Sequence, residues 1–227
     1  MRIIVMEIYL KEEQIATKNL SPGLRVYGEK LIIENQLIGD IEVETEYRLW
    51  NPYRSKLAGA LLNGMSKLNL ENDHKILYLG ASTGTTVSHI SDIVYDGLIY
   101  AVEFSPVTMR KLTRLADHRP NIAPILADAN KPKNYISLVE KVDFIYCDVA
   151  QPNQSDIFMN NINLFLKEEA NGLITIKARS IDVSKNPKKV FKEEEKKLIN
   201  KGFRIIEKIK LEPYEKDHLA LLVEKIL

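Results

Sequence analysis

The sequence is poor in the features that mark secreted and membrane proteins. Its 227 residues include a single cysteine, Cys147, which excludes an internal disulfide and is typical of a reducing compartment. The N-terminus has no signal-peptide pattern, and no apolar run approaches the roughly 20 residues that a membrane-spanning helix needs. Internal repeats and low-complexity segments are also lacking. We therefore expect a soluble intracellular protein with no membrane partner.

The chain also lacks an excess of charge of either sign. Lysine and arginine total 32 and aspartate and glutamate 31, which gives a formal net charge of +1. A protein that holds nucleic acid unaided usually carries a clear basic excess. We therefore expect any nucleic-acid binding to depend on a local basic surface or on a partner that supplies the affinity.

Strand and helix patterns alternate over residues 56–227. Apolar runs predict strands at 76–79, 98–102, 122–127, 142–147 and 172–176, and a final pair at 203–211 and 219–226. Apolar spacing and helix-start residues predict helices at 55–65, 85–94, 105–118, 135–140, 157–167 and 188–201. This order predicts an α/β, Rossmann-like, doubly wound sheet of seven strands, in which the closing hairpin makes one strand antiparallel.

Residues 1–55 have a different pattern. Short runs rich in β-branched residues at 3–10, 24–27, 31–34 and 41–49 are separated by turn signals at 21–23, 27–30 and 38–40. They predict a small antiparallel β domain over 1–55, ahead of the Rossmann-like domain over 56–227. Trp50 and Tyr53 are expected to pack at the junction rather than to contact a ligand.

The strand at 76–79 leads into the loop on which the predicted site depends. Gly80 and Gly84 allow a sharp turn and the close approach of a ligand to the backbone. The helix that begins at Thr85 offers free N–H groups to that ligand. Glu103 follows the next strand, where a carboxylate can accept hydrogen bonds from two ribose hydroxyls. The arrangement predicts an adenosine-containing cofactor at the carboxyl ends of parallel strands.

Nicotinamide dinucleotides and S-adenosylmethionine are both bound with an acidic residue in that position, and the sequence of the glycine loop distinguishes between them. Nicotinamide dinucleotides need a Gly-x-Gly-x-x-Gly loop for the pyrophosphate, whereas this loop is Gly-x-x-x-Gly. The hydroxyls of Thr85 and Thr86 suit a carboxylate and an amine, which S-adenosylmethionine carries. Asp128 can accept from an adenine amino group, and Phe104 can lie on the adenine face. We therefore favour S-adenosylmethionine over NAD.

Further polar residues follow the remaining strands, and each has an alternative structural role. Lys177 ends a strand among apolar residues, where it either pairs with an acid or is partly desolvated, which lowers its pKa and suits proton chemistry. Asp148 either serves the site or caps a turn. By default, His218 is a surface or satisfied histidine and Lys56 is solvent-exposed. The histidines share no metal-ligand spacing with one another or with the cysteine, so no metal is predicted.

Four stretches carry a resemblance to a known family: GASTGTTVSH at 80–89, YAVEFS at 100–105, DVAQ at 148–151 and IKARSID at 176–182. They closely resemble fibrillarins, the RNA 2′-O-methyltransferases of box C/D guide ribonucleoproteins. The likeness extends over nearly the whole chain, and Ser82-Thr83 departs slightly from the expected Ala-Ser. Fibrillarins of eukaryotic type have a Gly/Arg-rich leader that this chain lacks, so the resemblance implies the archaeal form and a cytoplasmic location.

The resemblance assigns roles that the pattern alone leaves open. It implies a catalytic set of Lys56, Asp148, Lys177 and His218. We expect Lys177 to take the proton from a ribose 2′-hydroxyl, with Asp148 or a bound water as alternative acceptors. Besides Gly80 and Gly84 of the loop, the implied contacts to S-adenosylmethionine are Thr85, Thr86, Glu103, Phe104, Asp128, Ala129, Asp148, Val149, Ala150 and Gln151.

The implied activity is guide-directed 2′-O-methylation of ribose in rRNA, with tRNA as a further target. The implied partners are a Nop-domain scaffold protein, a kink-turn-binding ribosomal-type protein, the box C/D guide RNA and the target RNA. Arg179 and the lysines of 185–189 either line the RNA side or form a solvated helix start. Two other classes stay open: a methyltransferase that acts alone on another substrate, and a non-catalytic assembly module that does not bind the cofactor.

Overall fold

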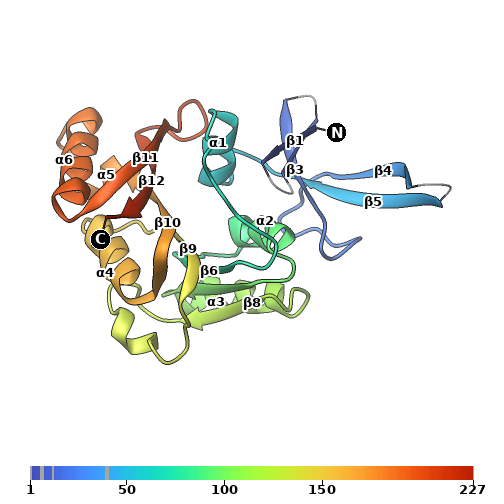
Figure 1. Ribbon diagram of the computed structural model, residues 1–227, viewed down its shortest axis with the longest axis horizontal. Coiled ribbons are helices and arrows are strands. Elements are labelled where there is room, and N and C mark those ends of the chain that lie inside the picture. Colours follow the sequence, from blue (N-terminus) through green and yellow to red (C-terminus); the bar gives the residue numbers. More distant parts are fainter. Residues whose placement is uncertain (1, 6–7, 12, 39–40, 227) are drawn as a thin grey trace.

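Figure 1 shows the computed structural model, which describes residues 2–5, 8–11, 13–38 and 41–226. The chain forms two sheets, one of five strands and one of seven. The predicted turn at 38–40 and part of the predicted strand at 3–10 lie outside the described residues. Within the described ranges, no helix has the length and apolar character needed to cross a membrane.

The larger sheet has the strand order β11-β12-β10-β9-β6-β7-β8. Its strands are β6 (Lys75–Leu79), β7 (Leu98–Glu103), β8 (Ile122–Leu126), β9 (Val142–Cys147), β10 (Leu166–Lys177), β11 (Phe203–Lys210) and β12 (His218–Lys225). Strands β6 to β10 pair in parallel, and β12 runs antiparallel between β10 and β11. The predicted doubly wound sheet with an antiparallel closing hairpin is confirmed.

Helices cover both faces of this sheet because successive strand residues point to opposite sides. Along β6, Ile76 and Tyr78 join one apolar core, and Leu77 and Leu79 join the other. The helices are α1 (Lys56–Leu62), α2 (Thr85–Ile93), α3 (Pro106–Ala116), α4 (Gln154–Phe165), α5 (Ala178–Ile181) and α6 (Pro187–Asn200), with a 3₁₀ turn η1 at Pro132–Tyr135. Residues of α1, α2 and α3 belong to the first core, and residues of α4 and α6 to the second.

The helix predicted at 135–140 is wrong. The chain instead forms η1, which ends at Tyr135, and then a turn. The ring of Tyr135 is fully buried and stacks on Phe165, while its hydroxyl donates to Asn161 at 2.5 Å. One anchored aromatic residue, rather than a helical apolar face, therefore holds this segment against the sheet.

The boundary between α4 and β10 also differs from the prediction. The helix predicted at 157–167 begins earlier, at Gln154, and ends at Phe165. Strand β10 starts at once with Leu166, which pairs with Val142 of β9 before the register shifts. The short helix α5, directly after β10, has no predicted counterpart. Residues 166 and 167, whose spacing also suits a helix, are therefore part of a strand because Leu166 pairs in the sheet.

The smaller sheet is antiparallel throughout, with the order β1-β2-β3-β5-β4. Its strands are β1 (Arg2–Val5), β2 (Ile8–Lys11), β3 (Gln14–Lys18), β4 (Leu31–Ile38) and β5 (Ile41–Leu49). Figure 1 shows the β4–β5 hairpin extending away from the rest of the molecule. The predicted antiparallel β unit is confirmed, although the single strand expected at 3–10 is two strands.

One predicted strand of this unit is wrong, and another was missed. Residues 24–27 form no strand, because the N–H groups of Val26 and Tyr27 donate to the Glu29 carboxylate and not to a neighbouring strand. The central strand is instead β3, at residues 14–18, which pairs with both β2 and β5.

A buried network of charged side chains joins the two sheets through α2. Arg48 of β5 contacts Glu29 (Nε–Oε1, 2.6 Å) and Asp92 of α2 (Nη1–Oδ2, 2.8 Å). Arg119, which precedes β8, contacts the other oxygen of Asp92 (Nη1–Oδ1, 2.6 Å). Each side chain is at most 1% exposed, so two arginines and two carboxylates balance their charges away from water.

His89 of α2 completes this junction. Its Nδ1 lies 2.7 Å from Thr17 Oγ1, its Nε2 lies 2.8 Å from the Tyr27 hydroxyl, and its ring stacks on the buried Trp50. Because the Thr17 hydroxyl donates its proton to Asp92, His89 must donate from Nδ1 and accept at Nε2. Burial, with help from two nearby arginines, lowers the pKa of His89 well below 6.5. The junction therefore holds a neutral histidine.

Candidate active site

The loop between β6 and α2 is bent so that two strand ends meet. Gly80 and Gly84 have left-handed backbones, with φ of 85° and 91°. A Cβ on Gly80 would fall 2.9 Å from the carbonyl oxygen of Asp148, and one on Gly84 would fall 2.4 Å from Leu115 Cδ2. Both positions therefore require glycine, and the loop packs directly against the segment that follows β9.

Glu103, the last residue of β7, is held by the backbone on both sides. It is 8% exposed. Its Oε2 accepts from the N–H of Ser82 at 2.7 Å, and its Oε1 accepts from the N–H of Ser105 at 2.8 Å. Each carboxylate oxygen can accept a second hydrogen bond, so Glu103 is a fixed acceptor with spare capacity for a ligand.

A cleft of about 410 Å³ opens at the carboxyl ends of the parallel strands, where the sequence places the site. The predicted cofactor-binding residues that line it are Gly80, Glu103, Phe104, Asp128, Ala129, Asp148, Val149, Ala150 and Gln151. Lys177 also lines the cleft, as do four residues that were not predicted: Ser82, Val102, Ala127 and Ile157. The ends of five neighbouring strands thus converge on one cleft.

Three predicted cofactor-binding residues lie outside the cleft lining. Gly84 is buried beneath α3. Thr86 is also buried, and its hydroxyl donates to Ser55 Oγ at the start of α1 (2.9 Å). Thr85 lines a separate groove. Contact between these three residues and a cofactor stays a prediction.

Two lysines from distant parts of the chain meet at Asp148. Lys177 Nζ lies 2.8 Å from Asp148 Oδ1 and donates to the Asp148 carbonyl oxygen at 2.7 Å. Lys56 Nζ lies 3.4 Å from the same carboxylate and 4.0 Å from Glu215. The side chains of the three predicted catalytic residues are only 12–19% exposed. Asp148 Oδ1 is buried, with ion-pair contacts but no hydrogen bond of good geometry.

His218 lies beside Lys177, because β12 pairs with β10 in the register Lys177–His218. Its Nδ1 is 2.6 Å from the Lys216 carbonyl oxygen. A carbonyl can only accept, so Nδ1 carries the proton. Its neighbour Asp217 accepts from the N–H of Ala178, which fixes the start of β12 against the end of β10. The structure therefore places His218 opposite Lys177 in the sheet.

Gln154 is a site residue that the sequence reading missed. Its side chain is fully buried at the first turn of α4. Its Oε1 accepts from the N–H of Lys177 at 2.9 Å, and its Nε2 donates to the Gln151 carbonyl oxygen at 3.0 Å. It thereby ties the end of β10 to the loop that follows β9. An amide in the first turn of a helix gives little sequence signal for this role.

Other titratable groups close to Asp148 are kept neutral. Burial, and next the Asp148 carboxylate, raise the pKa of the Tyr78 and Tyr146 phenols well above 10. Burial raises the pKa of the Cys147 thiol to about 12. These three groups therefore keep their protons at neutral pH.

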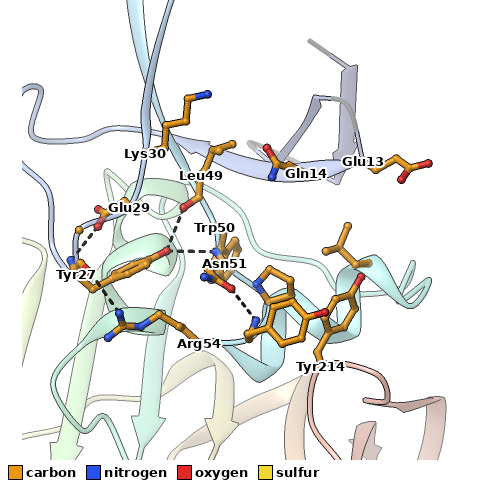
Figure 2. A pocket seen from close by; sticks show the side chains of 14 residues that line it. Glu13, Gln14, Tyr27, Glu29, Lys30, Leu49, Trp50, Asn51, Arg54 and Tyr214 are labelled. Atoms are coloured by element: carbon orange, nitrogen blue, oxygen red, sulfur yellow. Dashed lines mark hydrogen bonds between the residues drawn. The ribbon is translucent and has the colours of Figure 1, made fainter.

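A separate hollow of about 500 Å³ lies between the smaller sheet, α1 and the β11–β12 loop. Figure 2 shows Tyr27, Asn51 and Arg54 on one side of it and Tyr214 on the other. The Tyr27 hydroxyl oxygen, which donates to His89, also lies 3.1 Å from the Leu49 carbonyl oxygen. Tyr53, expected to pack at the junction, meets Tyr214 edge to face at 5.2 Å but stays 64% exposed.

A small polar group lies on the surface just before β6. Ligand atoms of Glu71, Asp73 and His74 come within 4.8 Å of one another. The Nδ1 of His74 accepts from the N–H of Glu71 at 3.2 Å. Because acidic surface groups often gather without an ion, we assign no metal here.

The seven-stranded sheet and its cleft define the class of this protein: a Rossmann-like α/β fold of the methyltransferase type, with an added N-terminal antiparallel sheet. A sequence profile of the fibrillarin family matches residues 2–226. A fibrillarin-like rRNA/tRNA 2′-O-methyltransferase of Methanothermobacter thermautotrophicus is 50% identical over 218 residues, which are 96% of this chain and 94% of that protein. The chain belongs to the fibrillarin family.

Two solved structures share this fold over nearly the full length. Aeropyrum pernix fibrillarin, in complex with natively bound S-adenosyl-L-methionine, is 47% identical with a TM-score of 0.80, over 93% of this chain and 89% of that one. The fibrillarin of a fibrillarin/Nop5p complex is 42% identical with a TM-score of 0.88, over 99% and 100%. The likeness therefore includes both sheets.

Proposed function

We propose that this chain is an S-adenosylmethionine-dependent RNA 2′-O-methyltransferase, the catalytic subunit of a guide-directed box C/D ribonucleoprotein that acts on rRNA and tRNA. The observation that carries the proposal is the meeting of Lys177 and Lys56 at Asp148, on the rim of a cleft that Glu103 also lines. Family membership supports it, since the relative named above has this activity in its name.

The cleft suits S-adenosylmethionine. Both oxygens of Glu103 are fixed by backbone N–H groups and can still accept from two ribose hydroxyls. The ring of Phe104 is 68% exposed and can cover an adenine face. Asp128 uses Oδ1 for the N–H of Asn130, which leaves its other oxygen for an adenine amino group. When bound, the cofactor supplies a methyl group on a positively charged sulfur.

The residues at the rim handle the proton. A ribose 2′-hydroxyl is a very weak acid, so its proton must leave as the oxygen–carbon bond forms. Lys177, as the neutral amine, is the proposed acceptor, with Asp148 or a bound water as the alternative. Lys56 stabilises the negative charge that develops on the oxygen. General-base catalysis of this kind contributes about 10²–10⁴-fold, and alignment of the reacting atoms supplies much of the rest.

Three neighbours hold Lys177 in place. The Asp148 carboxylate and carbonyl contact its Nζ atom, and Gln154 accepts from its backbone N–H. His218, its partner across the β10–β12 pair, completes the proposed catalytic set. The four proposed catalytic residues thus come from α1, the end of β9, the end of β10 and the start of β12.

The proposed assembly explains how a chain with a net charge of +1 acts on RNA. A Nop-domain scaffold protein and a kink-turn-binding protein hold the guide RNA, and the guide selects the target by base pairing. A fibrillarin of the same fold occurs in a complex with Nop5p, which supports the scaffold. The proposal includes a cytoplasmic location and the domains 1–55 and 56–227, docked through the buried network of Arg48 and Asp92.

Reconstitution tests the proposed function. The full chain is combined with scaffold protein, kink-turn-binding protein, guide RNA and target RNA, and supplied with S-adenosylmethionine labelled on the methyl group. We expect the label on the 2′-oxygen of the nucleotide that the guide selects, and we expect it to move when the guide sequence is changed. Label transfer without guide RNA would identify a stand-alone enzyme, and scaffold binding without cofactor binding would identify an assembly module.

A further inference from the structure

The glycine loop separates the cofactor cleft from a second groove of about 560 Å³. Gly80 and Ser82 line the cleft, whereas Thr83 and Thr85 line the groove. The other walls of the groove come from residues 21–27 of the N-terminal part and from α3 with the turn after it. We call this the α3 groove. A ligand bound there lies next to the loop that borders the proposed cofactor site.

Cationic side chains gather in the α3 groove. Arg25, Arg54, Lys111 and Arg114 line it beside the imidazole of His118, and all five side chains are exposed. Lys111, Arg114 and His118 follow one another at steps of three and four residues, which places them on one face of α3 and its continuation. Among the residues that the structure describes, no carboxylate lines the groove. The chain as a whole has a net charge of only +1, so this concentration is local.

These charges are not neutralised by the protein. Arg25, Lys111 and Arg114 form no ion pair within the described part of the chain. Arg54 is oriented by Tyr27: its Cζ lies 5.1 Å from the ring centroid, and its Nη1 donates to the Tyr27 carbonyl oxygen at 3.4 Å (Figure 2). The positive charge of the groove is therefore available to an external anion.

The basic segment that the sequence suggested for RNA differs in this respect. Arg179 Nε lies 2.9 Å from Asp217 Oδ2. Lys185 Nζ lies 2.9 Å from Glu193 Oε2 and 3.8 Å from Asp182 Oδ2. Acidic neighbours compensate these two cations, which weakens their attraction for a polyanion. Lys188 and Lys189 of the same segment form no ion pair within the described residues, so the contrast with the α3 groove concerns Arg179 and Lys185.

We propose that the α3 groove binds the phosphodiester backbone of the RNA that is presented to the active site. The proposal rests on the proposed function and adds a surface to it. Cations without counter-charges suit a polyanion, and contacts to phosphates carry no sequence information. A surface of this kind serves every target, which is what an enzyme directed by exchangeable guides requires. The adjoining glycine loop places the bound backbone beside the cofactor cleft.

The test compares two double variants of exposed residues on the full chain. Lys111→Gln/Arg114→Gln removes two groove charges, and Lys192→Gln/Lys196→Gln removes two exposed lysines one turn apart on α6. Each variant, bound to scaffold protein, is titrated against guide–target RNA carrying the kink-turn-binding protein, at several salt concentrations. We expect the groove variant to lower the slope of log affinity against log salt by about 1.4–1.8, since each lost phosphate contact removes about 0.7–0.9. The α6 variant should keep the wild-type slope.

Two controls on the groove variant locate the partner. Scaffold binding measured without RNA, and S-adenosylmethionine affinity, should both match the wild type. An unchanged salt slope overturns the proposal. Loss of scaffold binding without RNA also overturns it and assigns the groove to an acidic protein surface. Failure of the proposed function is distinguishable, because wild-type particles would then transfer no methyl group to the guided nucleotide.

Discussion

At the scale of single residues, Asp148 organises the proposed site. Its carboxylate lies within 3.4 Å of both Lys56 and Lys177, and its carbonyl oxygen accepts from Lys177. The same carbonyl packs against Gly80, where even a methyl group would approach to 2.9 Å. One residue thus links the two lysines to the loop that borders the cofactor cleft.

Glu103 offers a test of cofactor identity. We expect Glu103→Ala to weaken S-adenosylmethionine binding by on the order of 1.5–3 kcal/mol, because charge-assisted hydrogen bonds are lost. The affinity of Glu103→Gln should lie between those of the wild type and Glu103→Ala, since its amide oxygen still accepts from one backbone N–H. Calorimetry gives the affinities, and a melting curve of each variant shows whether the fold is intact. Normal binding by Glu103→Ala, or wild-type binding of NAD without S-adenosylmethionine, would refute this role.

At the scale of elements, the site depends on loops that leave parallel strands at one edge of the sheet. That convergence is predictable from sequence, because Glu103, Asp148 and Lys177 each mark the end of an apolar run. The role of Gln154 is not predictable, since it arises only when α4 packs beside the end of β10. The spacing of apolar residues also does not show that the Thr86 hydroxyl donates a hydrogen bond to Ser55.

Substitution of Gly80 tests the packing of the loop. In Gly80→Ala, the new Cβ meets backbone of the Asp148 segment, which cannot move aside cheaply. Gly64→Ala is the matched control: φ is 97° there, and no atom lies within 4 Å of the added Cβ. We expect both variants to lose about 1–3 kcal/mol of unfolding free energy from backbone strain. Only Gly80→Ala should also lose cofactor affinity and methyl transfer. Equal activity of the two variants would show that the loop tolerates the shift.

Two of the prediction errors, both in the N-terminal sheet, have the same physical cause. Residues 24–27 have strand-like side chains, but the Glu29 carboxylate takes the N–H groups of Val26 and Tyr27. In β3, Thr17 is fully buried because its hydroxyl bonds to Asp92 and lies against His89, more than 70 residues away. Polar partners leave no trace in hydrophobic periodicity, whether they are close in sequence, as Glu29 is, or distant, as Asp92 and His89 are.

At the scale of the whole molecule, the two sheets are held together by buried polar groups as well as by apolar contacts. Arg48, Asp92, Arg119 and Glu29 neutralise one another, and the neutral His89 is enclosed beside them. Because Asp92 and His89 lie on α2, the same contacts support the helix that follows the glycine loop. The N-terminal sheet therefore helps to hold the proposed cofactor site in shape.

Acid should weaken this junction. Burial lowers the pKa of His89 below its unfolded value of 6.5, so below that pH the unfolded chain binds a proton that the folded chain excludes. The unfolding free energy is at its full value above pH 6.5. Below that pH it falls by roughly 1 kcal/mol per pH unit, until the pKa of His89 in the folded state is reached. We expect His89→Gln to lose less unfolding free energy than the wild type between pH 7 and 5.5. Parallel pH profiles in urea denaturation would show instead that His89 titrates normally in the folded state.

The assignment of Lys177 is tested by single-turnover methyl transfer in the assembled particle, measured across pH with saturating S-adenosylmethionine. We expect Lys177→Ala to lose most transfer while cofactor affinity and assembly stay nearly normal. Lys177→Arg should not rescue it, because arginine keeps the charge but does not give up its proton at any workable pH. The comparison is read only for variants with normal cofactor affinity, since arginine is bulkier. A Lys177→Arg particle within a few-fold of wild type would move the proton to Asp148 or a water, and a fully active Lys177→Ala particle would contradict the proposed site.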